Sequence, residues 1–175
     1  MRELADAERI GRLLRGLGEV AERDGDCYLT GGATAVLVGW RATTIDVDLR
    51  LEPEQDSVLR ALARLKDELE VNVELASPAD FIPLPRCWRE RSPLVEREGR
   101  LSFRHFDLYS QALAKLERAH AHDLEDIGEM LARGLVEKSR LRSCFEEIEP
   151  ELYRFPAVDP ADFRKSVHAL LQAAP

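Results

Sequence analysis

Two aspartates, Asp46 and Asp48, alternate with apolar residues in the stretch TTIDVDLRL. Successive side chains of a β-strand point to opposite faces, so the carboxylates are expected on one face and Ile45, Val47 and Leu49 on the other. Paired carboxylates suit a divalent cation, because Mg²⁺ takes one or two protein carboxylates and completes its shell with water and phosphate oxygens. An exposed edge strand whose acidic residues face water would give the same pattern. The surrounding residues must therefore decide between the two interpretations.

A pair of glycines precedes these aspartates, in the stretch CYLTGGATAVLVG. The pattern predicts a short strand over residues 27–30, a turn at Gly31 and Gly32, and a short helix over residues 33–38. Glycine lets the backbone approach a ligand closely, and the N–H groups at a helix start can hold an anion. Phosphate at the glycines and a cation at the aspartates would make a nucleoside triphosphate site. A tight turn without a ligand explains the glycines alone equally well.

The rest of the chain supplies elements that could position these residues. Helices are predicted over residues 4–25 and 54–69, and strands over residues 43–51, 71–75 and 101–108. Prolines make residues 78–93 a long irregular segment, and beyond residue 108 the apolar residues recur only at helical spacing, with breaks near Gly134 and Pro150. We therefore predict an α/β (α+β) core over residues 1–108, followed by a helical region over residues 109–175 that packs on it.

Composition narrows the class of protein. The chain has 175 residues, of which 45% are hydrophobic and 33% charged, and no apolar run approaches the roughly 18 residues of a membrane span. The acidic N-terminus lacks the features of a signal peptide, so a cytoplasmic protein with no membrane partner is expected. Cys27, Cys87 and Cys144 have no metal-binding spacing and predict reduced thiols. A net charge of -8 argues against broad nucleic-acid binding, although six arginines within residues 86–105 could form a local basic patch or a solvated loop of mixed charge.

The order of these features resembles a known signature. From Gly31 to Asp48 the chain reads GG-x13-DVD, which resembles the DNA polymerase β-like nucleotidyltransferase superfamily. With its helical tail, the chain is most similar to minimal bacterial nucleotidyltransferases related to the AbiEii toxins. The resemblance implies a mixed sheet flanked by helices and an Mg²⁺- or Mn²⁺-dependent transfer of a nucleotide from an NTP, ATP among the candidates, to an acceptor hydroxyl. It also implies an antitoxin-like protein as a candidate partner.

The resemblance assigns roles to individual residues of the strands. Asp46 and Asp48 would hold the metal, with a third carboxylate on a neighbouring strand. Glu74 in VNVEL is the natural candidate for that carboxylate, and Asp107 in HFDLY is the alternative. A glutamate departs from the family's usual aspartate, which bears on the catalytic rate.

Further residues are assigned to the nucleotide. Gly31 and Gly32 would cradle phosphate. Arg41 and Thr44, which lie between the glycines and the aspartates in the sequence, could reach the nucleotide. In the stretch KLERAHAHDLED, Lys115 would meet triphosphate charge, while Asp123 and Asp126 would orient it or bind the acceptor. The same residues also fit a surface lysine and two acids in the first turn of a helix. His120 and His122 do not share a helix face, so a zinc site is not favoured.

These residues favour a nucleotidyltransferase whose acceptor is RNA, for example tRNA, or protein. The alternative is a catalytically inactive nucleotidyltransferase fold that acts as a protein-interaction module through its helical tail. A metal-dependent nuclease or phosphatase is less favoured, because neither requires the glycine pair and the lysine. The sequence leaves the donor nucleotide, the acceptor and the oligomeric state open.

Overall fold

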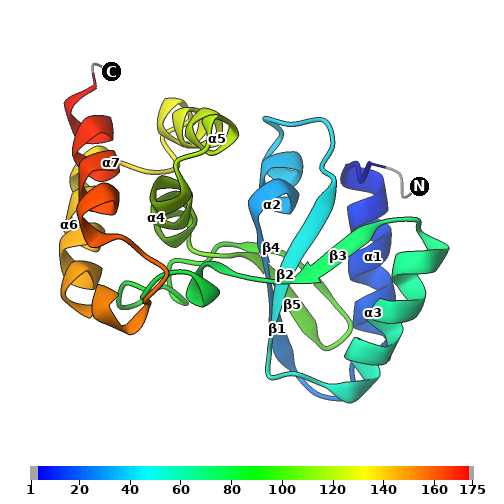
Figure 1. The fold of residues 1–175 in the computed structure, drawn as a ribbon. Coiled ribbons are helices and arrows are strands. Elements are labelled where there is room, and N and C mark those ends of the chain that lie inside the picture. The colour runs from blue at the N-terminus through cyan, green and yellow to red at the C-terminus, as the bar shows by residue number, and fades with distance from the viewer. Residues whose placement is uncertain (1–3, 174–175) are drawn as a thin grey trace. The chain divides into compact units, whose positions relative to one another are not determined.

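The structure, a computed structural model, describes residues 4–173 and divides the chain into two compact units (Figure 1). The first unit contains residues 1–77 and 92–106, and the second contains residues 78–91 and 107–175. The proline-rich segment predicted as part of the core thus belongs with the helices in this division, and the chain crosses between the units three times. The predicted domain boundary at residue 108 stays a prediction.

A mixed sheet forms the centre of the first unit, as predicted, and it has five strands, one more than expected. The strands are β1 Gly25–Thr30, β2 Asp46–Glu52, β3 Asn72–Leu75, β4 Leu94–Glu98 and β5 Leu101–His105, in the order β3-β2-β1-β5-β4. Strand β1 pairs antiparallel with β2 and parallel with β5, while β2 pairs parallel with β3. Three helices accompany the sheet: α1 Ala7–Val20, α2 Gly31–Val38 and α3 Asp56–Glu68. The predicted strand 101–108 is shorter than expected, because α4 begins at Leu108.

Alternation along β2 separates a core face from a polar face. Val47 and Leu49 are fully buried and join a cluster with residues of α1 and α3. Asp46 and Asp48 point to the other face and are half-buried. The expectation for Ile45 was wrong: its side chain is 70% exposed, because β2 begins only at Asp46. The strand therefore presents its carboxylates on a face that the α1 and α3 core leaves uncovered.

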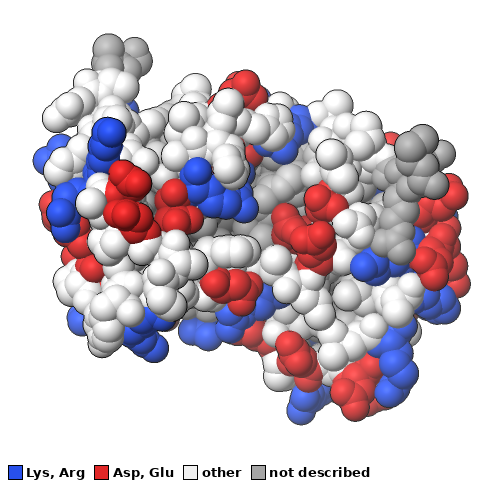
Figure 2. Space-filling view, in the orientation of Figure 1, with Lys and Arg blue, Asp and Glu red and all other residues white. Residues whose placement is uncertain are grey.

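Strand β4 was not predicted from the sequence. It pairs antiparallel with β5, and Gly99 between the two strands has a φ of +56°. Several arginines of the stretch 86–105 form ion pairs, among them Arg97 with Asp24 and Arg104 with Asp26. Lys and Arg side chains are interspersed with Asp and Glu on the face shown in Figure 2. Internal pairing of this kind weakens the interpretation of residues 86–105 as a basic patch for nucleic acid.

The second unit is helical, as expected from its periodicity. Its helices are α4 Leu108–Arg118, α5 Ala121–Ala132, α6 Lys138–Ile148 and α7 Pro160–Gln172, with short 3-10 turns at Pro78–Asp80 and Glu149–Arg154. Phe145 of α6 and Phe163 of α7 are buried and meet edge to face, with ring centroids 5.0 Å apart. No helix within residues 4–173 has the length and apolar character needed to cross a membrane.

Candidate active site

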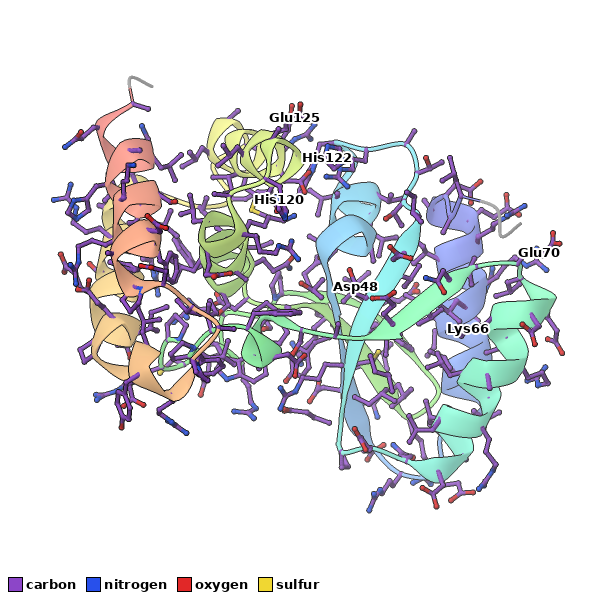
Figure 3. The ribbon with its side chains drawn as sticks, in the orientation of Figure 1. Asp48, Lys66, Glu70, His120, His122 and Glu125 are labelled. Carbon is purple, nitrogen blue, oxygen red and sulfur yellow. The ribbon has the colours of Figure 1, made fainter. Side chains whose placement is uncertain are left out.

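The strand register places the predicted carboxylates side by side in the first unit. Asp48 on β2 lies directly between Thr30 of β1 and Glu74 of β3, and Asp46 lies opposite Asn72 of β3. Paired residues of neighbouring strands point to the same face, so both aspartates and Glu74 share the polar face of the sheet. Figure 3 shows Asp48 on β2. Glu74 is exposed, whereas the two aspartates are half-buried.

The donor set of this face fits a hard divalent cation. It consists of carboxylate oxygens, which Mg²⁺ and Mn²⁺ prefer, and it does not enclose the ion. Among the residues that the structure describes, no group of three or more His, Cys, Asp or Glu side chains forms a ready-made cage for a metal. Mg²⁺ keeps several water or phosphate ligands, so two carboxylates on an open face meet its requirements.

Asp107, the alternative third carboxylate, has a different environment in the second unit. It caps helix α4 by accepting hydrogen bonds from the backbone N–H and the hydroxyl of Ser110, at 3.1 and 2.6 Å. The guanidinium of Arg91 also donates to both of its oxygens, at 2.9 and 2.8 Å. Glu74 alone of the two candidates shares the sheet face with the aspartates, so the register favours Glu74.

The glycine pair does not form a separate turn, contrary to the sequence-based prediction, because α2 begins at Gly31 directly after β1. Gly31 has a φ of +59°, and a Cβ atom there would lie 2.7 Å from an Oδ atom of Asp48. A Cβ atom on Gly32 would collide with the hydroxyl of Thr44. A side chain at Gly32 would therefore disturb the packing of α2 on β2, and one at Gly31 would displace the Asp48 carboxylate. Thr30 precedes the helix without a side-chain capping bond. The start of a helix is a place where backbone N–H groups can hold an anion.

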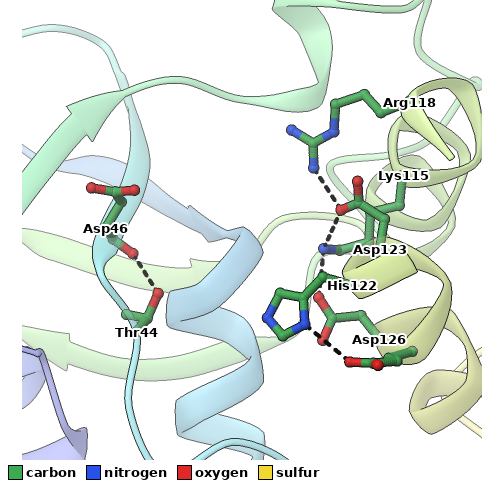
Figure 4. A network of polar contacts seen from close by, with 8 residues as sticks. Thr44, Asp46, Lys115, Arg118, His122, Asp123 and Asp126 are labelled. Atoms are coloured by element: carbon green, nitrogen blue, oxygen red, sulfur yellow. Dashed lines mark hydrogen bonds and ion pairs between the residues drawn. The ribbon is translucent and has the colours of Figure 1, made fainter. Parts of the chain in front are cut away.

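Thr44 and Arg41 lie in the connection between α2 and β2. Thr44 is buried, and its hydroxyl donates to the backbone oxygen of Asp46 at 2.9 Å (Figure 4). Its backbone also exchanges two hydrogen bonds with Ala5, at 2.8 and 2.9 Å. These contacts show that Thr44 braces the start of β2. A direct contact of Thr44 or Arg41 with the nucleotide stays a prediction.

Lys115 is at the centre of a buried charged network in the second unit (Figure 4). Its ammonium lies 3.2 Å from Oδ1 of Asp123 and 2.6 Å from Oδ2 of Asp126, and Arg118 lies 2.8 Å from the same oxygen of Asp123. Lys115 and Asp126 are only 5% and 2% exposed, so neither is a surface residue. The N-cap residue of α5 is His120, whose side chain makes no capping hydrogen bond. Asp123 and Asp126 lie within the helix, so a role as N-cap does not explain them.

The charges of this network act on one another. Burial raises the pKa of the Asp123 carboxyl, but hydrogen bonds and charges from Arg118 and Lys115 outweigh it and hold the pKa below its ordinary value. The lysine thus donates hydrogen bonds to both aspartates. That the aspartates orient it toward a triphosphate stays a prediction. His122 instead pairs with Glu125 at 3.0 Å, on the exposed surface of α5.

Two residues near the predicted site were not identified from the sequence. The Asn72 amide donates a hydrogen bond to Asp46. Asn72 and Glu74 are two residues apart on the same strand, so strand alternation could have indicated that they share a face. His105 at the end of β5 is buried, with Nδ1 3.1 Å from the hydroxyl of Thr34 in α2. Burial lowers its pKa to about 4, so the imidazole is neutral at physiological pH. It connects α2 to the sheet, and no pattern in the sequence marked it.

A mixed sheet with an Asp-x-Asp strand, and a glycine-started helix against it, define a protein of the nucleotidyltransferase-like α/β class. The model of one protein family, nucleotidyltransferases of unknown function (DUF6036), matches residues 9–159, and the chain belongs to this family. The predicted enzyme class, a nucleotidyltransferase, is thereby confirmed. No curated protein and no solved structure matches the chain. The AbiEii branch stays a prediction.

The glycine geometry gives a first testable prediction. Gly31→Ala is expected to lower the free energy of unfolding by about 1–2 kcal/mol, because alanine is strained at positive φ. The new Cβ would also displace the Asp48 carboxylate, so nucleotidyl transfer is expected to fall about a hundredfold. Gly39→Ala is the matched control, since its φ is +95° but nothing lies within 4 Å of its Cβ position. Urea denaturation and transfer assays should show similar stability losses and a loss of transfer in Gly31→Ala alone. Equal transfer by both variants would contradict the role of Gly31.

Proposed function

We propose that the protein transfers a nucleotide from a nucleoside triphosphate to an acceptor hydroxyl at the polar face of the first unit. The observation that carries the proposal is the strand register that sets Asp46, Asp48 and Glu74 side by side, next to the glycine-started helix. Family membership supplies the reaction class. The register supports the choice of these three carboxylates.

In this proposal the chain binds and orients the reactants. Asp46 and Asp48 hold Mg²⁺ or Mn²⁺, which when bound neutralises charge on the triphosphate and on the leaving pyrophosphate. The N–H groups at Gly31 and Gly32 hold a phosphate, with Arg41 and Thr44 beside the nucleotide. Glu74 is the third metal-binding carboxylate, next to Asp48. The acceptor oxygen forms a bond to the α-phosphorus as the bond to the bridging oxygen breaks, pyrophosphate leaves with the electron pair, and the hydroxyl proton passes to water.

The network of Lys115, Asp123 and Asp126 has a supporting role in this proposal. The resemblance to AbiEii-type enzymes assigns the lysine to the triphosphate and the aspartates to its orientation or to the acceptor. The hydrogen bonds from the lysine to both aspartates support the orienting part of that assignment.

A finer proposal concerns the acceptor and the cellular role. The resemblance to AbiEii-type enzymes favours the toxin-like member of a two-gene system, acting on tRNA or protein and controlled by an antitoxin-like partner. Arginines at positions 86, 91, 97 and 104 form ion pairs within the protein, and the chain carries a net charge of -8. Both observations disfavour a nucleic-acid surface. We therefore propose a protein hydroxyl as the first acceptor to test, with tRNA as the second.

The experiment that tests the site is thermal stability with each of the four NTPs, with and without Mg²⁺. A ligand that binds only the folded state adds roughly 2.7 kcal/mol at about 100 times its Kd. We expect one nucleotide to stabilise the protein in a Mg²⁺-dependent way, and the Asp46→Ala/Asp48→Ala variant to lose that gain. An equal gain in the variant would place the nucleotide elsewhere. No gain with any NTP would favour the interaction module that retains the fold without the chemistry.

A further inference from the structure

Asp46 has fewer strand neighbours than Asp48. Asp48 is paired on both sides, by Thr30 of β1 and Glu74 of β3. The pairing of β1 with β2 ends at Thr30 and Asp48, so within the described pairing Asp46 has its strand neighbour on β3 alone. It is also the first residue of β2, next to the exposed Ile45. The orientation of the Asp46 carboxylate therefore depends strongly on the residue across from it.

That residue is Asn72, and its side chain acts on the carboxylate directly. Asn72 lies opposite Asp46 in the parallel pairing, and its amide Nδ2 donates a hydrogen bond to Oδ1 of Asp46. An amide is a neutral donor, so it restrains one oxygen without changing the charge of the site. An aspartate at this position would place another negative charge opposite Asp46, and like charges on opposite residues repel. A lysine or arginine at position 72 would neutralise the negative charge of the Asp46 carboxylate, which a bound cation requires.

The backbone that carries Asn72 is anchored as well. Strand β3 has four residues and lies at the edge of the sheet, paired with β2. The ammonium of Lys66 on α3 donates to the backbone oxygen of Val73, between Asn72 and Glu74, at 2.8 Å. Figure 3 shows Lys66 on α3. This bond ties the edge strand to a helix of the core and limits the movement of Asn72 relative to β2.

We propose that Asn72 is a positioning residue that holds the Asp46 carboxylate in the orientation needed to bind the divalent cation and the triphosphate. The role rests on the proposed function of the aspartates as metal ligands. Residues that hydrogen-bond to metal ligands typically contribute 10- to 100-fold to metal affinity or activity. Asn72 thus belongs to the site although it does not touch the reactants.

The test measures Mn²⁺ binding by electron paramagnetic resonance, without nucleotide, together with kcat and KM. Asn72→Ala is expected to weaken Mn²⁺ binding about tenfold and to lower kcat/KM by at least as much. In Asn72→Asp we expect Mn²⁺ affinity to hold or increase, because a negative charge is added, while kcat falls because Asp46 is displaced. Asn72→Gln keeps the donor and should recover part of both. Leu75→Ala, an exposed change on the same strand, is the matched control and should leave both unchanged.

The outcomes separate this inference from the proposed function. If Asp46→Asn abolishes Mn²⁺ binding while Asn72→Ala behaves like Leu75→Ala, the positioning role is wrong and the proposed function stands. If Asp46→Asn leaves Mn²⁺ binding unchanged, both are wrong. Should Asn72→Ala fail to fold, the side-chain amide resonances of Asn72 in the wild-type protein decide. They should shift in Asp46→Ala, where the acceptor is removed, and an unchanged resonance would overturn the inference.

Discussion

Asparagine in place of Asp48 is expected to reduce nucleotidyl transfer about a thousandfold and to make the metal-free protein slightly more stable. A thousandfold loss corresponds to about 4 kcal/mol of transition-state stabilisation, which is within the range that a metal ligand contributes. The gain in stability follows from charge. Asp48 lies directly opposite Glu74 and shares the face with Asp46, so its carboxylate repels two others when no cation is bound.

Relief of that repulsion sets the size of the stability gain. Like charges on opposite residues of neighbouring strands destabilise by roughly 0.2–1 kcal/mol, so Asp48→Asn should gain a few tenths of a kcal/mol in urea denaturation without metal. Opposite changes in stability and activity are typical of residues that serve a reaction. Substitution of a residue that serves the fold lowers stability and activity together.

The matched control lies on the same strand and face. Glu52 ends β2 and pairs with Arg50 at 2.9 Å, with both side chains partly exposed. Glu52→Gln should lose a few tenths of a kcal/mol, because a partly exposed ion pair contributes little, and should retain full transfer activity. A destabilised Asp48→Asn with normal activity would show that the carboxylate belongs to the fold and would remove it from the site.

Much of the fold follows from local patterns that the sequence displays. Val47 and Leu49 alternate with Asp46 and Asp48, and this alternation alone assigned the core face and the polar face of β2. Gly31 was identified because glycine before a short helix lets the backbone approach a ligand. The contact that the structure shows for it, with the Asp48 carboxylate, depends on a strand that begins 15 residues later. Local pattern identifies such residues, and tertiary contact explains them.

Other features depended on contacts that local pattern does not contain. Strand β4 reads LVERE, in which three of five residues are charged, and it forms because β5 supplies a partner across Gly99. The resemblance assigned Lys115 to a phosphate, and the alternative was a surface lysine. Lysine is seldom buried, and the burial of Lys115 depends on two carboxylates from the next helix. The role of Asn72 could not be predicted from local pattern, because its partner Asp46 is 26 residues away in the sequence.

Methionine in place of Lys115 is expected to lower the free energy of unfolding by about 3–5 kcal/mol, because removal of one partner leaves buried charge without its counter-ion. Asp126 is affected most: it is 2% exposed, and Lys115 donates to it at 2.6 Å. Asp123 keeps the hydrogen bond from Arg118 at 2.8 Å. Arg118→Gln is the matched control, and because the Arg118 side chain is 43% exposed it should cost about 1 kcal/mol or less.

The second carboxylate provides a rescue. In Lys115→Met/Asp126→Asn the buried charge disappears together with its partner, so we expect at least half of the lost stability to return, as a double-mutant cycle by urea denaturation would measure. Acid should narrow the difference between Lys115→Met and the wild type. The network lowers the pKa of Asp123, so its contribution is present above the ordinary carboxyl pKa of 3.8 and is lost as the pH falls through the lower folded-state value.

These measurements also separate the two roles assigned to Lys115. If the lysine holds α4 and α5 together, Lys115→Met loses stability with or without an NTP, and the double variant recovers stability without depending on nucleotide. If the lysine is instead a triphosphate ligand, Lys115→Met keeps wild-type stability in the absence of nucleotide and loses only the stabilisation that an NTP provides. Loss of both would mean that the network holds the helices and that the ammonium still reaches phosphate, which requires Lys115 to exchange one aspartate for the ligand. The predicted cost of 3–5 kcal/mol is far larger than the scatter of such measurements, so the three cases are distinguishable.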